Sequence, residues 1–204
     1  IDLKNSKYTF KENTGYINQL PLAFDGFIQL VEENQLYDIH FKTPTSSFKN
    51  ALALIPEKYS GNLKTIQTKG NFDLEGTVKG TLSATTIPKF NINISSKNAM
   101  FKYADLPKSV QNININSQII NATGYTKDTY VAINTLNFKI DEDEFSANGN
   151  IKKITTNPQI DFNAKGTINL ENISKVYPFA LENELSGMLT AYVSTNFDMN
   201  AIEK

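Results

Sequence analysis

The 204-residue sequence contains no cysteine, no tryptophan and only one histidine. Without cysteine there are no disulfides, thiolate metal sites or thiol nucleophiles. The lone histidine, His40, lacks the partners of a catalytic triad or a histidine-based metal site, so we interpret it as a solvated side chain on a strand. No apolar run approaches the roughly 18 residues of a transmembrane helix. The residues therefore predict a protein without catalytic equipment, cofactor or metal.

Charge of one sign is also missing, since 20 basic side chains balance 21 acidic ones for a net charge of -1. This balance gives no electrostatic reason to expect a nucleic-acid partner. The sequence begins at Ile1 rather than at a methionine. We therefore expect a fragment of a longer protein, with any signal or membrane anchor outside the fragment.

What the sequence has in abundance is short stretches in which apolar and polar residues alternate. The clearest example lies within residues 70–107, where Phe90, Ile92 and Ile94 alternate with asparagine and serine. A period of two is typical of a strand with one apolar and one polar face. Asparagine fills many of the polar positions, as in residues 112–116, and we interpret these as solvated strand faces.

The alternation and the turn residues between the stretches predict a series of strands joined by hairpin-length connections. Turn signals are Asp25-Gly26, residues 32–35 and the acidic cluster at 141–144. Besides the several short strands of residues 70–107, the expected strands are 16–24, 26–31, 36–41, 110–120, 130–140, 144–151, 160–164 and 186–197.

Two segments have helical spacing instead. In residues 45–59, Ser46 or Ser47 is placed to cap a short helix that Pro56 ends, and Asn169 is placed to cap a second helix over residues 170–177. Helices this short are not stable alone, so their apolar sides are expected to rest on the sheet or to cover an end of its core.

The helical segments also reveal an imperfect internal repeat. Residues 48–56 match residues 170–178, and residues 85–93 match residues 155–163. Repeats of this kind bury their apolar faces only against neighbouring units. We therefore predict one repetitive β domain over residues 1–204, with units of about 1–80 and 81–204.

The expected fold is mainly β: an elongated, curved, largely antiparallel repeat sheet with two short helices. Its apolar side either forms a groove for an apolar ligand or folds over into a partly closed sandwich, and the residues alone do not decide between them. The strand residues of one parity that would line such a groove, or pack such a core, are Phe72, Leu74, Val78, Leu82, Phe90, Ile92, Ile94, Ile113 and Ile115.

Three other groups of residues have alternative interpretations. The acidic cluster 141–144 lacks the spacing of a calcium loop and is better interpreted as a wet hairpin turn. Gly70, Gly76 and Gly80 lie inside strands and have no following Lys-Ser/Thr, so bulges or strand ends explain them better than phosphate binding. Three tyrosines would suit a sugar-stacking platform, although half-buried strand aromatics are favoured, and they are Tyr103, Tyr125 and Tyr130.

Taken together, several motifs resemble the AsmA family of bacterial envelope proteins, in particular AsmA-like proteins of the Bacteroidetes type, related to TamB and to bridge-like lipid transfer proteins. The resemblance covers most of the chain. The motifs that carry it are residues 48–56, residues 70–80, Pro88-x-Phe90, Phe101-x-Tyr103-x-x-Leu106-Pro107, Val110-x-Asn112-Ile113, Gly166-x-Ile168-Asn169-Leu170 and Leu185-Ser186-Gly187.

The resemblance implies a periplasmic segment of a protein anchored in the inner membrane by a part outside this fragment. It implies a non-enzymatic role in which phospholipid or another acyl-chain lipid binds to, or moves along, an apolar β-sheet face during outer-membrane lipid transport and envelope assembly. The alternative is a structural module that pairs with envelope proteins through its sheet edges. A carbohydrate-binding or hydrolytic domain is a third hypothesis.

Overall fold

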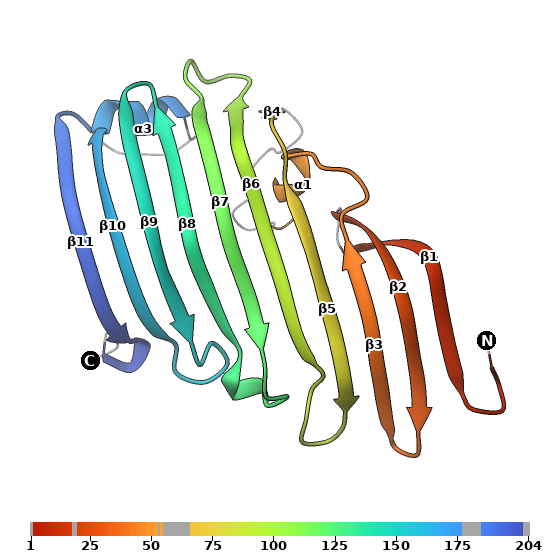
Figure 1. Ribbon diagram of the computed structural model, residues 1–204. Coiled ribbons are helices and arrows are strands. Elements are labelled where there is room, and N and C mark those ends of the chain that lie inside the picture. Colours follow the sequence, from red (N-terminus) through yellow and green to blue (C-terminus); the bar gives the residue numbers. More distant parts are fainter. Residues whose placement is uncertain (1, 18–19, 53, 55–65, 177–184, 202–204) are drawn as a thin grey trace.

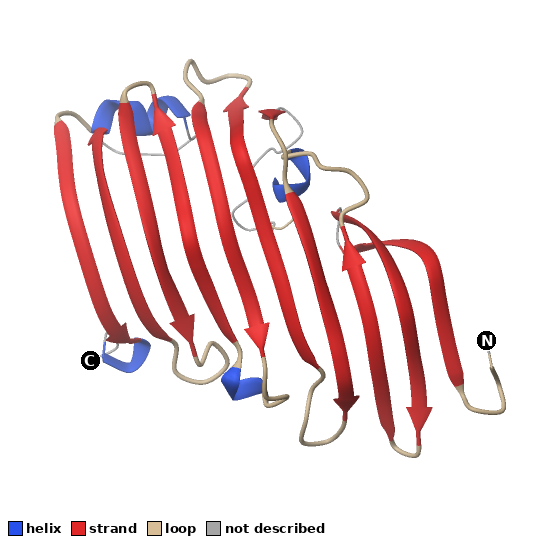
Figure 2. Cartoon of the chain, in the orientation of Figure 1, coloured by secondary structure: helices blue, strands red, loops and turns tan. Residues whose placement is uncertain are grey.

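The computed structural model describes residues 2–17, 20–52, 54, 66–176 and 185–201. Within these ranges the chain forms long strands and two short α-helices, α1 (Lys49–Leu52) and α3 (Leu170–Val176), with 3-10 turns η2 (Thr126–Asp128) and η3 (Met199–Ala201) (Figures 1 and 2). The strands are β1 (Lys7–Ile17), β2 (Leu20–Val31), β3 (Asn34–Lys42), β4 (Ile66–Lys69), β5 (Asp73–Leu82), β6 (Lys89–Tyr103), β7 (Val110–Asn121), β8 (Tyr130–Ile140), β9 (Asp143–Lys152), β10 (Gln159–Asn169) and β11 (Met188–Asp198).

All eleven strands belong to one antiparallel sheet that does not close on itself. The order is β1-β2-β3-β5-β6-β7-β8-β9-β10-β11, so nearly every strand pairs with its neighbour in sequence. The exception is β4, which pairs with Met100–Tyr103 of β6, while β5 pairs with Lys89–Ser95 of the same strand. The predicted fold class, mainly β with an antiparallel curved sheet and two short helices, is confirmed.

The pairing register gives the sheet one apolar and one polar face. Residues that pair directly across strands share a face, because successive side chains alternate. One row across β6 to β11 consists of Ile92, Ile119, Val131, Ile151, Ile160 and Phe197. The row of opposite parity consists of Asn93, Gln118, Ala132, Asn150, Asp161 and Asn196.

The buried core lies at one end of the apolar face, which we call the helix end because α1 and α3 both lie there (Figure 1). Phe48, just before α1, and Val176 of α3 pack against the sheet as part of this core. The buried cluster is Leu20, Leu22, Phe48, Phe72, Leu74, Ala99, Val110, Ile113, Ile140 and Val176. The opposite end, where β5 leads into β6 and β7 into β8, is called the loop end.

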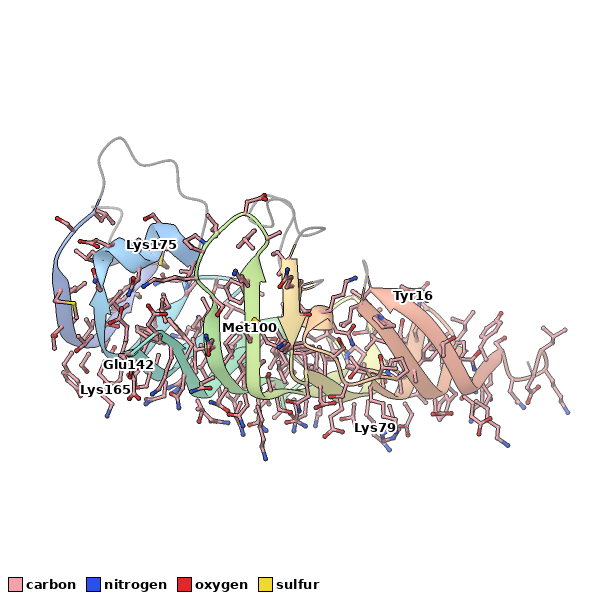
Figure 3. All side chains as sticks on the ribbon, turned by 90° about the horizontal axis from the view of Figure 1, so that it is seen from above. Tyr16, Lys79, Met100, Glu142, Lys165 and Lys175 are labelled. Atoms are coloured by element: carbon pink, nitrogen blue, oxygen red, sulfur yellow. The ribbon has the colours of Figure 1, made fainter. Side chains whose placement is uncertain are left out.

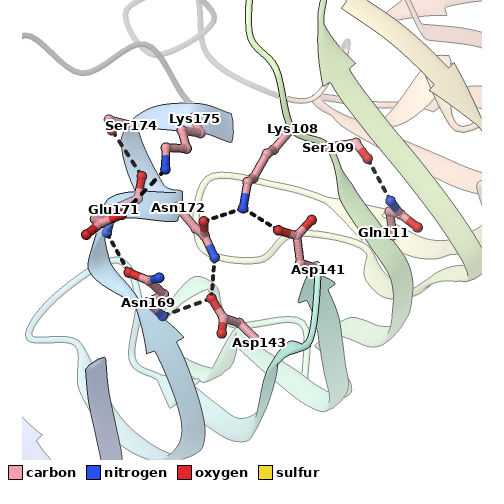
Figure 4. A network of polar contacts seen from close by, with 10 residues as sticks. All are labelled: Lys108, Ser109, Gln111, Asp141, Asp143, Asn169, Glu171, Asn172, Ser174 and Lys175. Atoms are coloured by element: carbon pink, nitrogen blue, oxygen red, sulfur yellow. Dashed lines mark hydrogen bonds and ion pairs between the residues drawn. The ribbon is translucent and has the colours of Figure 1, made fainter. Parts of the chain in front are cut away.

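A polar network holds α3 on the helix end of the sheet (Figure 4). Asp143 Oδ2 accepts hydrogen bonds from the Asn169 backbone N–H and from Asn172 Nδ2, each at 2.8 Å. Lys108 Nζ donates to Asn172 Oδ1 at 2.6 Å and forms an ion pair with Asp141. The acidic turn between β8 and β9 therefore contributes to the docking of a helix.

Two strand assignments were wrong. Residues 70–107 form two long strands, β5 and β6, rather than several short ones. The predicted strand over residues 16–24 spans the end of β1 and the start of β2, and the predicted Asp25-Gly26 turn lies inside β2. The reason is a bulge in β1, where the Glu12 backbone N–H donates to Asp25 Oδ1 at 2.6 Å. Gly26 adopts a φ of +129° and lies against β3. Asp25-Gly26 therefore lies opposite the bulge in β1 and does not form a turn.

The helix predictions are confirmed for the part of each segment that is described. The second helix forms as α3, and Asn169 Oδ1 accepts a hydrogen bond from the Glu171 backbone N–H at 3.1 Å, as a capping residue does. The first forms as α1, which is only four residues long. It begins at Lys49 and is directly preceded by Phe48, so the predicted cap at Ser46 or Ser47 was wrong. Residues 55–59 of the predicted first helix, and Tyr177 with Pro178 of the second, lie outside the described residues.

Candidate functional site

Among the described residues, no helix covers the part of the apolar face nearer the loop end. The six-residue row Ile92, Ile119, Val131, Ile151, Ile160 and Phe197 crosses it, and we call this row the open apolar strip. Each of its side chains is half-buried rather than buried. In the described part of the chain both α-helices lie at the helix end, so neither covers the strip (Figure 1).

A second apolar feature lies on strands β1 to β3. It is a hollow of about 420 Å³ whose lining contains no charged side chain. The Phe24 ring there also packs edge-on against Phe10, with ring centroids 5.4 Å apart. The lining residues are Gly15, Tyr16, Ile17, Leu22, Phe24, Ile39 and Phe41.

The nine groove residues predicted from sequence divide into two groups. Three are buried in the core at the helix end: Phe72, Leu74 and Ile113. The others are half-buried strand residues, and register pairs such as Val78 with Phe90 place them on the same apolar face. This second group is Val78, Leu82, Phe90, Ile92, Ile94 and Ile115. Only the second group has surface left to offer a ligand.

Sequence reasoning missed the apolar residues of β1 to β3. Phe24 pairs with Phe41 across β2 and β3, and Ile39 pairs with Val78 of β5, so all lie on the same face as the predicted residues. Their period of two was visible in the sequence. The wrong assignment of residues 16–24 as one strand hid it, because that strand has no consistent parity.

The polar face carries charged side chains and a larger hollow. Lys79 and Lys165 point away from the side on which Lys175 of α3 lies (Figure 3). Near the helix end a hollow of about 840 Å³ extends from β7 to β11. Within it Lys139 forms an ion pair with Glu144. The hydrogen bond and positive charge of Lys139 lower the pKa of Glu144, and Glu144 likewise raises the pKa of Lys139.

The remaining sequence candidates form no shared site. His40 is exposed on β3, with Nε2 3.6 Å from Asp38 Oδ1. Asp38 also pairs with Lys79 at 2.8 Å, and this hydrogen bond holds the pKa of Asp38 below its usual value. Tyr103 is buried at the helix end of β6, whereas Tyr125 is exposed at the loop end, so these tyrosines make no common platform.

Comparisons with known proteins return nothing: no protein-family model, no curated protein and no solved structure matches the chain. Among the described residues, no helix has both the length and the apolar character needed to cross a membrane. The same residues include no group of three or more acidic, histidine or cysteine side chains placed to hold a metal ion.

Proposed function

We propose that the chain is a non-enzymatic, lipid-handling segment of a larger AsmA-like envelope protein, and that acyl chains bind on its apolar sheet face. The observation that carries this proposal is the open apolar strip, a continuous row of six half-buried apolar residues across six strands. Contiguous exposed apolar surface of this kind marks interaction sites in proteins. The likeness of the sequence motifs to the AsmA family supports the same role.

The physical basis of binding is area burial. An acyl chain laid across the strip removes its own methylenes and the strip's side chains from water, which is worth about 0.8 kcal/mol per methylene. The hollow on β1 to β3 extends the uncharged surface beyond the strip. The proposed ligand is a phospholipid or another acyl-chain lipid. The proposed location is the periplasm, with the inner-membrane anchor in a part of the parent protein outside these residues.

Native mass spectrometry of gently purified protein tests the proposal first, and bound phospholipid or fatty acid is the expected result. The second test is saturable uptake of a fluorescent phospholipid by delipidated protein. Ile92→Glu is expected to abolish uptake, since binding an acyl chain would then desolvate a carboxylate. Circular dichroism checks that this variant remains folded.

Asn91→Glu is the matched control. Asn91 is the exposed neighbour of Ile92 on the same strand and faces the opposite side of the sheet. The Asn91→Glu variant adds the same charge as Ile92→Glu but on the polar face, so lipid uptake is expected to persist. Failure of the unmodified protein to take up lipid, or equal loss in both variants, overturns the proposal.

The alternative function, pairing with another envelope protein through a sheet edge, has a specific observation in its favour. Both outer strands have one strand neighbour among the described residues. β1 protects its free edge with Lys7, Lys11, Glu12 and a bulge. β11 carries only one charged residue, Asp198, at its last position, so its backbone is an unprotected edge.

This alternative is tested by sedimentation over a range of concentrations and by capture of a β11 peptide. Thr190→Lys and Ser194→Lys place charges on β11 positions that are exposed. If the edge pairs with another strand, association of the unmodified protein is expected to disappear in the double variant. A monomer at every concentration, with no peptide capture, contradicts edge pairing.

A further inference from the structure

The hollow on the polar face near the helix end is built from one cross-strand row. In register across β7 to β11 the row is Asn114, Asn137, Ser146, Lys165 and Tyr192. All five line the hollow, whose volume of about 840 Å³ lies in the range of ligand-binding clefts. This face is opposite to the apolar face, so the hollow is separate from the open apolar strip.

Most hydrogen-bonding groups of this row are unused by the protein. Asn114 is engaged: its Oδ1 accepts from the Asn98 backbone N–H at 3.1 Å, and its Nδ2 donates to the Asn112 carbonyl at 2.8 Å. Among the described residues, the side chains of Asn137, Ser146 and Lys165 and the Tyr192 hydroxyl have no hydrogen bond to the protein. The four therefore offer donors and acceptors to a ligand along a line across four strands.

The charges around the hollow cancel. Its lining contains Lys139 and Lys165 together with Glu142 and Glu144, and Lys139 and Glu144 already neutralise each other. A site with no net charge gives no attraction to a phosphate backbone or an anionic headgroup. The lining therefore suits an uncharged molecule that is rich in hydrogen-bonding groups.

Tyr192 supplies the last element of the site. Its side chain is 75% exposed, and the ring stands at the end of the row beside Lys165. An aromatic ring with a polar tip suits a ligand that has an apolar face and a polar rim. A pyranose ring has both, with C–H groups on its face and hydroxyl groups around its edge.

We infer that this hollow is a binding site for a neutral glycan, in which Tyr192 stacks on a sugar ring while Asn137, Ser146 and Lys165 bind hydroxyl or acetamido groups of the chain. Amide and hydroxyl side chains both donate and accept, as sugar hydroxyls do, and the Lys165 ammonium donates, so the row matches a ligand that itself carries no charge. The inference is independent of lipid binding, because the two surfaces lie on opposite faces.

The experiment is an NMR titration of the ¹⁵N-labelled chain with three neutral hexasaccharides, chitohexaose, cellohexaose and maltohexaose. At least one is expected to produce saturable shifts centred on the amides of residues 137, 146, 165 and 192. Tyr192→Ala and Asn137→Ala are each expected to weaken binding by about fivefold or more.

Tyr16→Ala is the matched control, since Tyr16 is 77% exposed on β1, the strand at the opposite edge of the sheet from β11. Binding is expected to be unchanged in this variant, and also in Ile92→Glu. The inference is overturned if none of the three sugars causes saturable shifts up to its solubility limit. It is equally overturned if the shifts map outside the row, or if Tyr16→Ala weakens binding as much as Tyr192→Ala.

Discussion

Asn172 of α3 is hydrogen-bonded to Asp143 of β9, with Nδ2 donating to Oδ2 at 2.8 Å (Figure 4). Asn172 is buried, and its Oδ1 accepts from Lys108 at 2.6 Å, so both ends of the amide are satisfied. The corresponding residue of the first helix motif is Asn50, whose Nδ2 donates to the Thr45 carbonyl at 3.0 Å. The asparagine that recurs in both copies of the helix motif is therefore hydrogen-bonded in each, to side chains of other elements at Asn172 and to a nearby backbone carbonyl at Asn50.

Removing the Asp143 carboxylate is expected to destabilise the fold. Asp143→Ala leaves the Asn172 amide and the Asn169 N–H without their acceptor, which costs about 1–3 kcal/mol for each buried group left unsatisfied. Urea unfolding followed by circular dichroism measures the loss. Glu142→Ala, at the exposed neighbouring turn residue, is the control and is expected to change stability by less than about 0.5 kcal/mol. Equal effects would contradict the role assigned to Asp143.

The two regions of the apolar face are expected to respond differently to truncation. Phe72 is 1% exposed in the core at the helix end, so Phe72→Ala should cost about 3–5 kcal/mol of unfolding free energy. Phe90 lies on the same face but is half-buried, so Phe90→Ala should cost about 1–2 kcal/mol because less area is lost. Chemical denaturation of both variants tests this. A larger loss for Phe90→Ala would show that the apolar face at Phe90 is closed rather than open.

Gly26 is expected to be intolerant of any side chain. A Cβ there would collide with the Asp38 carbonyl and come within 2.9 Å of the Ile39 Cα, and φ is +129°. Gly26→Ala should therefore destabilise the fold by more than the conformational strain alone, which is about 1–2 kcal/mol. Gly187 separates the two causes, since φ is +101° but nothing lies within 4 Å of its added Cβ. Comparable melting temperatures for Gly26→Ala and Gly187→Ala would refute the steric argument.

The ion pair in the polar hollow is expected to titrate in a predictable direction. The hydrogen bond and charge of Lys139 hold the pKa of Glu144 below the ordinary glutamate value of 4.5. Because the folded pKa is depressed, the stabilisation is present above the unfolded pKa and is lost as the pH falls through the folded pKa. Lys139→Met should raise the pKa of Glu144 towards 4.5, as measured by NMR titration of its carboxyl group. Lys165→Met, which removes a lysine not paired with Glu144, should leave the pKa of Glu144 unchanged.

The strands that sequence reasoning predicted well are those in which the alternation runs over most of their length, although bulges interrupt it in β7 and β8. Val110–Asn121, Tyr130–Ile140 and Asp143–Lys152 form almost where the alternation places them. The error at residues 16–24 has a physical cause: Gly26 and Asp25 carry turn chemistry but act in a bulge, which depends on the neighbouring strand. Local sequence propensity cannot predict such a bulge, because the bulge forms only when β1 pairs with β2.

Alternation in the sequence determined that this chain forms strands with one apolar and one polar face, and turn residues determined that neighbours pair antiparallel. Which apolar residues are buried was decided only by the tertiary structure, because burial depends on where α1 and α3 lie over the sheet. Phe72 and Phe90 have the same local pattern, yet only Phe72 belongs to the buried core. The row from Asn137 to Tyr192 likewise exists only through strand register, since its members lie far apart in sequence and adjacent in the sheet.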